Sequence, residues 1–430
     1  MTKSLEQKVL SFRWLIFLVL ALAYFFVYFH RLSLSVVAND LVRDFKTTAG
    51  VMGLLGSVYF YCYAVMQFPA GLLSDSLGPR KTVTTFLLLA AVGSILFGFA
   101  PSITMAFVGR VMVGFGVSMV FIPTMKILSQ WFRAREFALM AGILNAVGGI
   151  GVMAATWLLA LMTGHFGWRL SFELIGGVTF FLVLLIWLIV RDRPEDRGWP
   201  SLAEIDHQGG GEVPVVDRIG LWAGARRVVT EKYFWPVAVW FFFDCGIFFA
   251  FGALWSGPYL MHVYGYSRAE AGAILSMIAW GMIFGSPLLG ILSERVFHSR
   301  KKVLMVCMAV LTAEFFFLYL HPSGLPRPLL YGVFFLFSFC SSAVVVIGFT
   351  TTKELFPAAI TGTSVGTVNL FPFLGGAVFM PLLGKVLDAY PKTAAGGYAL
   401  EAYTKLLLIL AVSSLICLFC TFMMKETCQS

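Results

Sequence analysis

Charged residues are scarce in this sequence, and their scarcity excludes most soluble folds. Only 12% of the 430 residues are Asp, Glu, Lys or Arg, whereas 59% are hydrophobic. A soluble domain carries about 25% charged residues. The net charge of +9 comes mostly from short polar segments between apolar stretches, which argues against a nucleic-acid-binding surface. The chain is therefore predicted to be an integral membrane protein surrounded by lipid, with no nucleic-acid partner.

Motifs for enzymatic chemistry and for cofactors are also missing. The sequence has no P-loop Gly-Lys-Ser/Thr and no metal-binding spacing among its six histidines. Six of the seven cysteines lie inside apolar stretches, where small apolar filler is the expected role rather than a disulfide framework or a redox pair. We predict a protein that is not an enzyme and needs neither a cofactor nor a metal.

In place of charge the sequence has apolar stretches of about 20 residues, and each is long enough to cross a hydrocarbon core of about 30 Å. Backbone inside lipid must satisfy its own hydrogen bonds, so each stretch is expected to be a helix. The first stretch is too long for a signal peptide and lacks an A-x-A-like exit. The predicted fold class is an all-α membrane protein with twelve transmembrane helices at residues 14–38, 50–74, 83–100, 104–129, 137–163, 170–190, 233–261, 270–292, 303–320, 328–349, 360–386 and 401–424.

Lysine and arginine in the short loops predict the orientation of these helices. Thirteen fall on the side of the N-terminus and seven on the other, which places both termini in the cytoplasm by the positive-inside rule. The longest connection, 191–232, begins "RDRPEDRGWP" and is predicted to be a cytoplasmic linker between residues 1–190 and residues 233–430. The expected location is the inner (plasma) membrane of a bacterium.

Two sequence patterns occur twice, in the same order. "GLLSDSLGPRKT" from Gly71 aligns with "GILSERVFHSRKK" from Gly290, and each copy follows the second span of its half. "WFRAREFALMAGILNAVGG" aligns with "LFPAAITGTSVGTVNLFPFLGG", so that Asn145 matches Asn369 at a separation of 224 residues. Internal repeats of this length are typical of transporters built from two similar halves.

With these features the chain resembles the major facilitator superfamily over its whole length. The resemblance implies two pseudo-symmetric six-helix bundles, with one central site exposed alternately to the two sides of the membrane. It also implies a cytoplasmic conformational latch, because a carboxylate in such a loop favours a neighbouring helix N-terminus and basic residues. A plain solvated turn is the alternative. The latch residues would be Gly71, Asp75, Gly78, Arg80 and Lys81, with Gly290, Glu294 and Arg300 in the second copy.

Arg31 lies well inside the first apolar stretch, where an ionisable residue costs about 2.5–3.5 kcal/mol on insertion scales. The chain resembles the anion–cation symporters and organophosphate–phosphate antiporters of the family, which carry an arginine at this place. The resemblance implies that Arg31 binds the anionic group of the substrate, since a guanidinium can hold a carboxylate with two hydrogen bonds. A structural ion pair with Asp244 is the alternative.

Other polar residues within the spans are further candidates. Asp244 is predicted to bind a coupling proton, the ammonium of a zwitterionic substrate, or only Arg31. Glu314 and Arg110 are secondary proton-coupling candidates, with Glu314 otherwise structural. Snorkelling, helix–helix hydrogen bonds and packing are the alternatives for the remaining substrate-binding candidates, namely Lys126, Asn145, Asn369, Tyr63, Gln67, Trp255 and Tyr259.

The sequence departs from the organophosphate antiporters at two places. It has Gln67 where they have a lysine nearby, and its seventh span lacks a second arginine. A carboxylate or zwitterion is therefore favoured over a doubly charged phosphate ester. We predict a monomeric secondary transporter that takes up a small organic anion with protons. The alternatives are an exporter or antiporter of amino acids, siderophore-like polycarboxylates or drugs, a membrane sensor, and a membrane enzyme.

Overall fold

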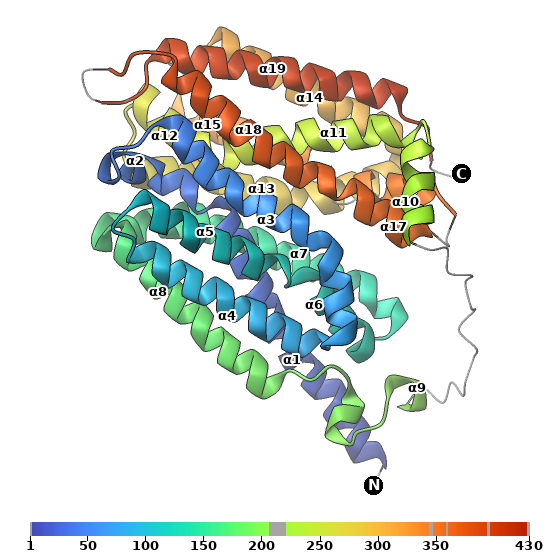
Figure 1. Cartoon of the computed structure of the whole chain (residues 1–430). Coiled ribbons are helices and arrows are strands. Elements are labelled where there is room, and N and C mark those ends of the chain that lie inside the picture. Colours follow the sequence, from blue (N-terminus) through green and yellow to red (C-terminus); the bar gives the residue numbers. More distant parts are fainter. Residues whose placement is uncertain (1, 206–220, 344–346, 358–359, 394–395, 428–430) are drawn as a thin grey trace. The chain divides into compact units, whose positions relative to one another are not determined.

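The computed structural model describes residues 2–205, 221–343, 347–357, 360–393 and 396–427, and these residues are almost entirely helical (Figure 1). Within them, extended pairing is limited to one isolated bridge between Lys392 and Tyr398. The predicted all-α fold class is confirmed. It follows from an apolar chain whose backbone groups are paired within each helix.

The helices have the following bounds. Along the first 205 residues the chain forms α1 (Thr2–Leu32), α2 (Leu34–Asp44), α3 (Ala49–Ser76), α4 (Pro79–Gly98), α5 (Ile103–Ser118), α6 (Phe121–Trp131), α7 (Ala134–Met153), η1 (Ala154–Leu158), α8 (Leu159–Ile189), η2 (Pro194–Arg197) and α9 (Leu202–Ile205). From residue 221 onward it forms α10 (Leu221–Thr230), α11 (Phe234–Ile247), η3 (Phe248–Trp255), α12 (Ser256–Val263), α13 (Arg268–Ile291), η4 (Leu292–Val296), α14 (Arg300–Leu320), α15 (Arg327–Ser341), α16 (Phe349–Glu354), α17 (Thr361–Val368), α18 (Leu370–Asp388) and α19 (Leu400–Met423).

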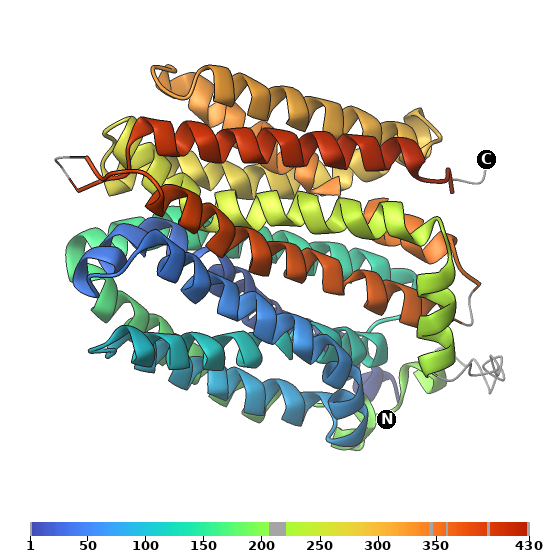
Figure 2. The same cartoon turned by 45° about the horizontal axis from the view of Figure 1, so that its top comes forward.

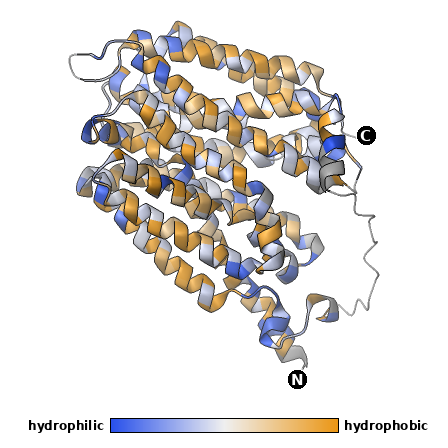
Figure 3. Ribbon diagram, viewed as in Figure 1, coloured by the Kyte–Doolittle hydropathy of each residue, from blue (hydrophilic) through white to orange (hydrophobic). Residues whose placement is uncertain are grey.

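Ten helical segments of the described chain are long and apolar enough to cross a membrane. Figure 3 shows apolar residues along these helices and hydrophilic ones gathered near their ends. The protein is thus a multi-pass membrane protein. One segment, Leu139–Ile189, is 51 residues long and is interrupted at Gly167, whose φ of +76° is not helical. The shorter Arg327–Ser341 is apolar too. The count of twelve spans stays a prediction. It requires Leu139–Ile189 to form two spans, divided at Gly167, and Arg327–Ser341 to form one more.

Local irregularities mark several of the long helices. The segments η1, η3 and η4 are π-helical turns, and α3, α13 and α18 contain Pro69, Pro287 and Pro381 in their interiors. Prolines and π-turns free backbone groups and bend a helix, and π-turns gather at functional positions. The turn η3 matters below because it supplies one wall of the candidate site.

Backbone contacts group the chain into two compact units. The first unit comprises Met1–His30, Val65–Gly151 and Arg169–Val216, and the second comprises Arg31–Ala64, Val152–Trp168 and Asp217–Ser430. In the first unit α4 and α5 pack side by side, and in the second unit α11 packs against both α18 and α19 (Figure 2). The predicted division into bundles at residues 1–190 and 233–430 stays a prediction.

Glycine allows α18 to approach α11 closely in the second unit. A Cβ atom added at Gly375 would lie 2.0 Å from the carbonyl oxygen of Phe242, a backbone atom that cannot move alone. By contrast, a Cβ atom at Gly366 of α17 would have no neighbour within 4 Å.

We therefore expect Gly375→Ala to force α18 away from α11 and to destabilise the protein by about 1–3 kcal/mol. The thermal unfolding temperature in detergent measures this loss. Gly366→Ala is the matched control and should unfold at the wild-type temperature or slightly above it. Equal unfolding temperatures for the two variants would contradict the close packing of these helices.

Candidate functional site

Arg31 lies in the last turn of α1 and is only 7% exposed. Its guanidinium carbon is 5.1 Å from the ring centre of Tyr63, and 5.5 Å from each of the rings of Phe249 and Phe373. A cation within about 6 Å of an aromatic face is attracted by the ring quadrupole, more strongly when it is desolvated. We call Arg31 and these three rings the Arg31 cage.

The rings of the Arg31 cage come from separate helices and are themselves braced. Tyr63 of α3 stacks on Phe373 of α18 with ring centres 4.2 Å apart. Phe60 of α3 lies 4.6 Å from Phe249 of η3. The cage thus joins α1 and α3, from before the predicted linker, to η3 and α18, from after it. All of these residues belong to the second unit.

The sequence analysis selected Arg31 and Tyr63, and the structure brings these two together. It missed Phe249 and Phe373. Both lie in aromatic runs, "FFFDCGIFFAF" and "NLFPFLGG", in which nothing in the sequence separates a ring that faces a cation from one that packs against lipid. The π-helical turn η3, which carries Phe249, became visible only in the structure.

The two predicted acidic residues of the C-terminal spans are both buried. Asp244 of α11 is fully buried, and its Oδ1 accepts a hydrogen bond of 3.2 Å from the Ser341 hydroxyl of α15. Glu314 of α14 is 7% exposed, and neither of its carboxyl oxygens has a hydrogen-bond partner in the described part of the chain. Both residues stay proton-coupling candidates because their carboxyl groups are buried within apolar helical segments.

Lys126 contacts the last turn of α3, in the first unit. Its Nζ donates a hydrogen bond of 3.1 Å to the Ser74 carbonyl. Nearby, Gly78 has a φ of +89° and begins α4. The Arg80 N–H donates a bond of 2.6 Å to Asp192, and the Arg80 guanidinium lies 4.3 Å from the Trp187 ring and donates to the Trp187 carbonyl. Burial raises the pKa of the Asp192 carboxyl, and the Arg80 N–H opposes that rise.

The carboxylate seated at the start of α4 is therefore Asp192, from the beginning of the linker. The surroundings of Gly71 and the side chain of Asp75 lie outside what the structure describes. Lys81 is exposed. The sequence analysis missed Asp192 because the motif pointed to an acid within its own loop. The only signal was the acidic "RDRPEDRG" segment directly after the sixth predicted span.

The second copy of the loop forms an ion-pair network in the second unit. Arg300 holds Glu354 of α16 through two hydrogen bonds of 2.8 and 2.7 Å, and its Nη1 is 3.6 Å from Glu294. Gly290 is buried near the end of α13. Glu426 accepts from the N–H groups of Arg300 and Lys301 at the start of α14. The predicted pair of Glu294 and Arg300 is thus close, but the stronger partner of Arg300 is Glu354.

The remaining predicted residues lie in varied surroundings. The Tyr28 hydroxyl is 3.5 Å from the Asn145 side-chain oxygen, and Asn369 ends α17. Trp255 donates to the Met380 carbonyl at 3.1 Å, and Tyr259 to the Pro322 carbonyl at 2.7 Å. Both rings are fully buried and hydrogen-bonded to backbone, so packing explains them well. Gln67 is half-buried in α3, and Arg110 is buried in α5.

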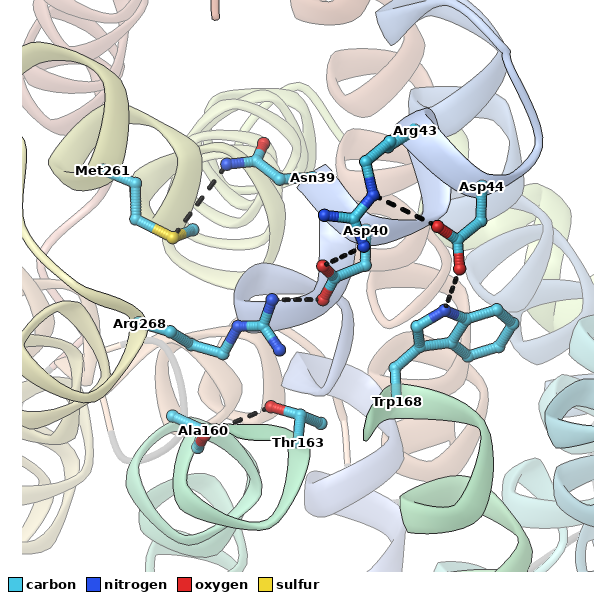
Figure 4. Close-up of polar contacts among 9 residues, drawn as sticks. All are labelled: Asn39, Asp40, Arg43, Asp44, Ala160, Thr163, Trp168, Met261 and Arg268. Carbon is cyan, nitrogen blue, oxygen red and sulfur yellow. Dashed lines mark hydrogen bonds and ion pairs between the residues drawn. The ribbon is translucent and has the colours of Figure 1, made fainter. Parts of the chain in front are cut away.

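A second charged group joins distant parts of the chain (Figure 4). Asp40 of α2 is ion-paired with Arg268 at the start of α13, and also lies 3.3 Å from Arg43. Asp44 accepts a bond of 2.8 Å from the Trp168 indole and one of 3.3 Å from Arg43. We call these five residues the Asp40 cluster. In the sequence the charged members of this cluster look like ordinary loop charges, because the sequence does not show which loops meet.

Asp388 and close-packed glycines extend the contacts at this end of the helices. The Asp388 carboxylate accepts from the N–H groups of Ala49 and Gly50, at 2.8 and 2.6 Å, and thereby caps α3. A Cβ atom on Gly257 would lie 1.9 Å from the Ser35 carbonyl oxygen, and one on Gly53 would lie 2.4 Å from that of Met380. Helices from the two sequence halves are therefore in backbone contact here, which explains why residues 31–64 belong to the second unit.

Comparison with known proteins identifies the family. The model of the Major Facilitator Superfamily matches residues 20–380. This chain belongs to the Major Facilitator Superfamily. It is 24% identical to a probable sulfoacetate transporter of Cupriavidus necator (68% of this chain and 67% of that protein). It is also 24% identical to a probable galactarate/D-glucarate transporter of Escherichia coli (89% and 90%). A glycerol-3-phosphate transporter of Bacillus subtilis is 25% identical (79% and 78%).

The fold comparison agrees with the family. A bacterial homologue of the human lysosomal transporter Spinster, solved in an inward-facing conformation, superposes with a TM-score of 0.76 at 19% identity, covering 96% of each chain. The predicted resemblance to the anion-transporting branches of the superfamily is confirmed by the relatives. The superfamily member described here is a membrane transporter and not an enzyme.

One further ion pair in the first unit involves Glu136, which lies between two apolar helical segments and outside both. Arg13 of α1 holds Glu136, at the start of α7, through bonds of 2.8 and 3.1 Å, and the Arg133 N–H donates to Glu136 at 3.0 Å. Burial by itself raises the pKa of Glu136. The hydrogen bonds and positive charges of Arg133 and Arg13 outweigh burial, and the net pKa lies below that of an ordinary glutamate.

A lowered carboxyl pKa stabilises the fold above the ordinary value of about 4.3, and the stabilisation disappears as the pH falls through the lower pKa of the folded protein. We expect Glu136→Gln to lower the unfolding temperature at pH 7 and to match the wild type at about pH 3. Glu401→Gln, at an exposed position of α19, is the control. A Glu136→Gln deficit that persisted unchanged at acidic pH would show that charge is not its cause.

Proposed function

We propose that this protein imports a small organic anion bearing a carboxylate, that Arg31 binds that carboxylate, and that protons drive the uptake. The observation that carries the proposal is the Arg31 cage. A guanidinium is held at the end of α1, buried, against three aromatic faces. A buried cation in a transmembrane bundle marks a substrate or ion pathway. The relatives named for sulfoacetate and galactarate/D-glucarate transport support an anionic substrate.

The cage is suited to releasing as well as binding an anion. Three cation–π contacts hold the Arg31 guanidinium, and each contact is weaker than a bidentate hydrogen bond to a carboxylate. A carboxylate bound by Arg31 would therefore add a stronger contact to these. The rings belong to α3, η3 and α18, so that binding at Arg31 acts on helices from both sequence halves.

Asp244 is the proposed coupling group. It is fully buried and its one hydrogen bond in the described chain is to a neutral hydroxyl, that of Ser341. A proton taken up with the substrate would neutralise this carboxyl while the loaded site turns inward, and the proton would be released with the substrate on the cytoplasmic side. Glu314 is a second buried carboxyl that could serve the same purpose, and the two are separable by mutation.

The contacts near the Asp40 cluster support a transporter closed at that end. The distribution of loop charges supports assigning this end to the periplasmic side. The Asp40–Arg268 ion pair, the Asp388 cap on α3 and the glycine contacts hold this end shut. In this proposal both termini are cytoplasmic, and the protein acts as a monomer in a bacterial inner membrane.

Uptake into proteoliposomes tests the role of Arg31. We expect radiolabelled D-glucarate or sulfoacetate to accumulate faster when the outside is acidic. Arg31→Ala should lower uptake at least about 30-fold, because a charge-assisted contact worth about 2 kcal/mol or more is lost. Arg31→Lys keeps the charge without the planar fork and should be intermediate. Arg226→Ala, exposed in α10, is the control. If glycerol 3-phosphate were the only compound taken up, the proposed carboxylate substrate would be wrong and a phosphate ester would be the substrate class.

Breaking the Asp40–Arg268 ion pair is expected to shift the conformation of the transporter. Removing one partner, as in Arg268→Gln, should favour the form open at this end by about 1–3 kcal/mol, or 5- to 150-fold. The readout is labelling of a Ser35→Cys variant by an impermeant maleimide added outside, because Ser35 is buried against Gly257. The charge swap Asp40→Arg with Arg268→Asp should return labelling toward the wild-type rate. Asp196→Asn, in an exposed pair with Arg193, should leave it unchanged.

A further inference from the structure

The second unit contains an apolar cavity of about 160 Å³ that is separate from the Arg31 cage. It lies between α13, η4, α14 and α15, and its walls include Phe297, Val306, Val310, Leu336 and Phe339. An apolar cavity of about 150 Å³ holds a benzene molecule, so this one can hold part of a hydrocarbon chain. Its wall residues are all apolar or cysteine, which excludes a polar solute as the occupant.

The cavity borders a face that the membrane covers. Val306 is 55% exposed, Phe297 45% and Leu336 39%, although all three are large apolar side chains in a membrane protein. Contiguous exposed apolar residues of this kind mark contact with lipid or with a partner. The cavity therefore meets the hydrocarbon of the bilayer, where acyl chains are the abundant apolar molecules.

Basic residues extend the cavity wall toward the loop between η4 and α14. Lys302, Val306 and Val310 of α14 are spaced four residues apart, which places them on one face of the helix. Lys302 is exposed, as is Arg295 at the end of η4, two residues before Phe297. Neither side chain forms an ion pair among the described residues.

The other charges of this loop already have partners. Arg300 is held by Glu354 and lies near Glu294, and the Lys301 ammonium donates to the Phe422 carbonyl at 2.7 Å. Glu426 takes the first N–H groups of α14. Arg295 and Lys302 are thus the two cations left to meet an anion at the mouth of the cavity.

We infer that this surface binds one anionic phospholipid, with an acyl chain in the cavity and its phosphate between Arg295 and Lys302. Both halves of the ligand are needed for the fit. The apolar wall recognises hydrocarbon but not charge, and the two cations recognise a negative headgroup but not a chain. The site rests on the second unit alone and is independent of the substrate proposed for Arg31.

Native mass spectrometry of the purified, delipidated protein tests this site. The probes are phosphatidylglycerol and phosphatidylcholine with identical acyl chains, added at equal concentrations. We expect one phosphatidylglycerol to be retained about 10- to 30-fold more tightly than phosphatidylcholine, as follows from two cations near an anionic headgroup. Equal retention of the two lipids would overturn the headgroup assignment.

Two variants separate the two parts of the site. Arg295→Gln with Lys302→Gln should abolish the preference for phosphatidylglycerol, whereas the matched double change Arg226→Gln with Arg227→Gln on α10 should preserve it. Val310→Phe fills the cavity and should weaken retention of both lipids. The unfolding temperature of each variant in lipid-free detergent verifies that it is folded. Loss of preference in both double variants, or unchanged binding by a folded Val310→Phe, would overturn the proposal.

Discussion

The buried guanidinium of Arg31 is the constraint on which the candidate site of this transporter depends. Arg31 lies in an apolar helix, and removing a guanidinium from water without compensation is too costly for a membrane bundle to sustain. Three aromatic faces offset part of that cost. Each of these contacts is weaker than a charge-assisted pair, so a carboxylate from solution would bind Arg31 more strongly than a ring does. The anion specificity that we propose depends on this arrangement.

The same cation ties together parts of the chain that are distant in sequence. The cage draws rings from α3, η3 and α18, and the braced pairs of Tyr63 with Phe373 and of Phe60 with Phe249 link the two sequence halves again. Further along, the Asp40 cluster, the Asp388 cap and the close glycine contacts join those halves at one end of the helices. A site of this kind responds to rearrangement of the halves, which is what alternating access requires.

Charge has three separate uses in this molecule. In the spans it is rare and buried, as at Arg31, Arg110, Asp244 and Glu314. In the loops it forms ion pairs that fix helix ends, as Asp192 does at α4 and Glu354 does for Arg300. On the face of α13–α15 charge is exposed beside an apolar cavity, at Arg295 and Lys302, and neither forms an ion pair within the described ranges. These uses differ in whether the charge lies within a span and in whether it has a partner. Amino-acid composition shows neither of these properties.

The sequence by itself determined that the chain is helical, crosses the membrane and needs compensation for Arg31, because hydropathy and the cost of a buried charge are local properties of one segment. Family membership also followed from the two repeated patterns. Only the tertiary structure decided which groups provide the compensation. Phe249 and Phe373 resemble the many other aromatic residues, Asp192 accepts the Arg80 N–H although no motif pointed to it, and Arg268 looks like an ordinary loop charge until it meets Asp40. Partners are chosen by which helices pack together, and that depends on contacts between segments far apart in the chain.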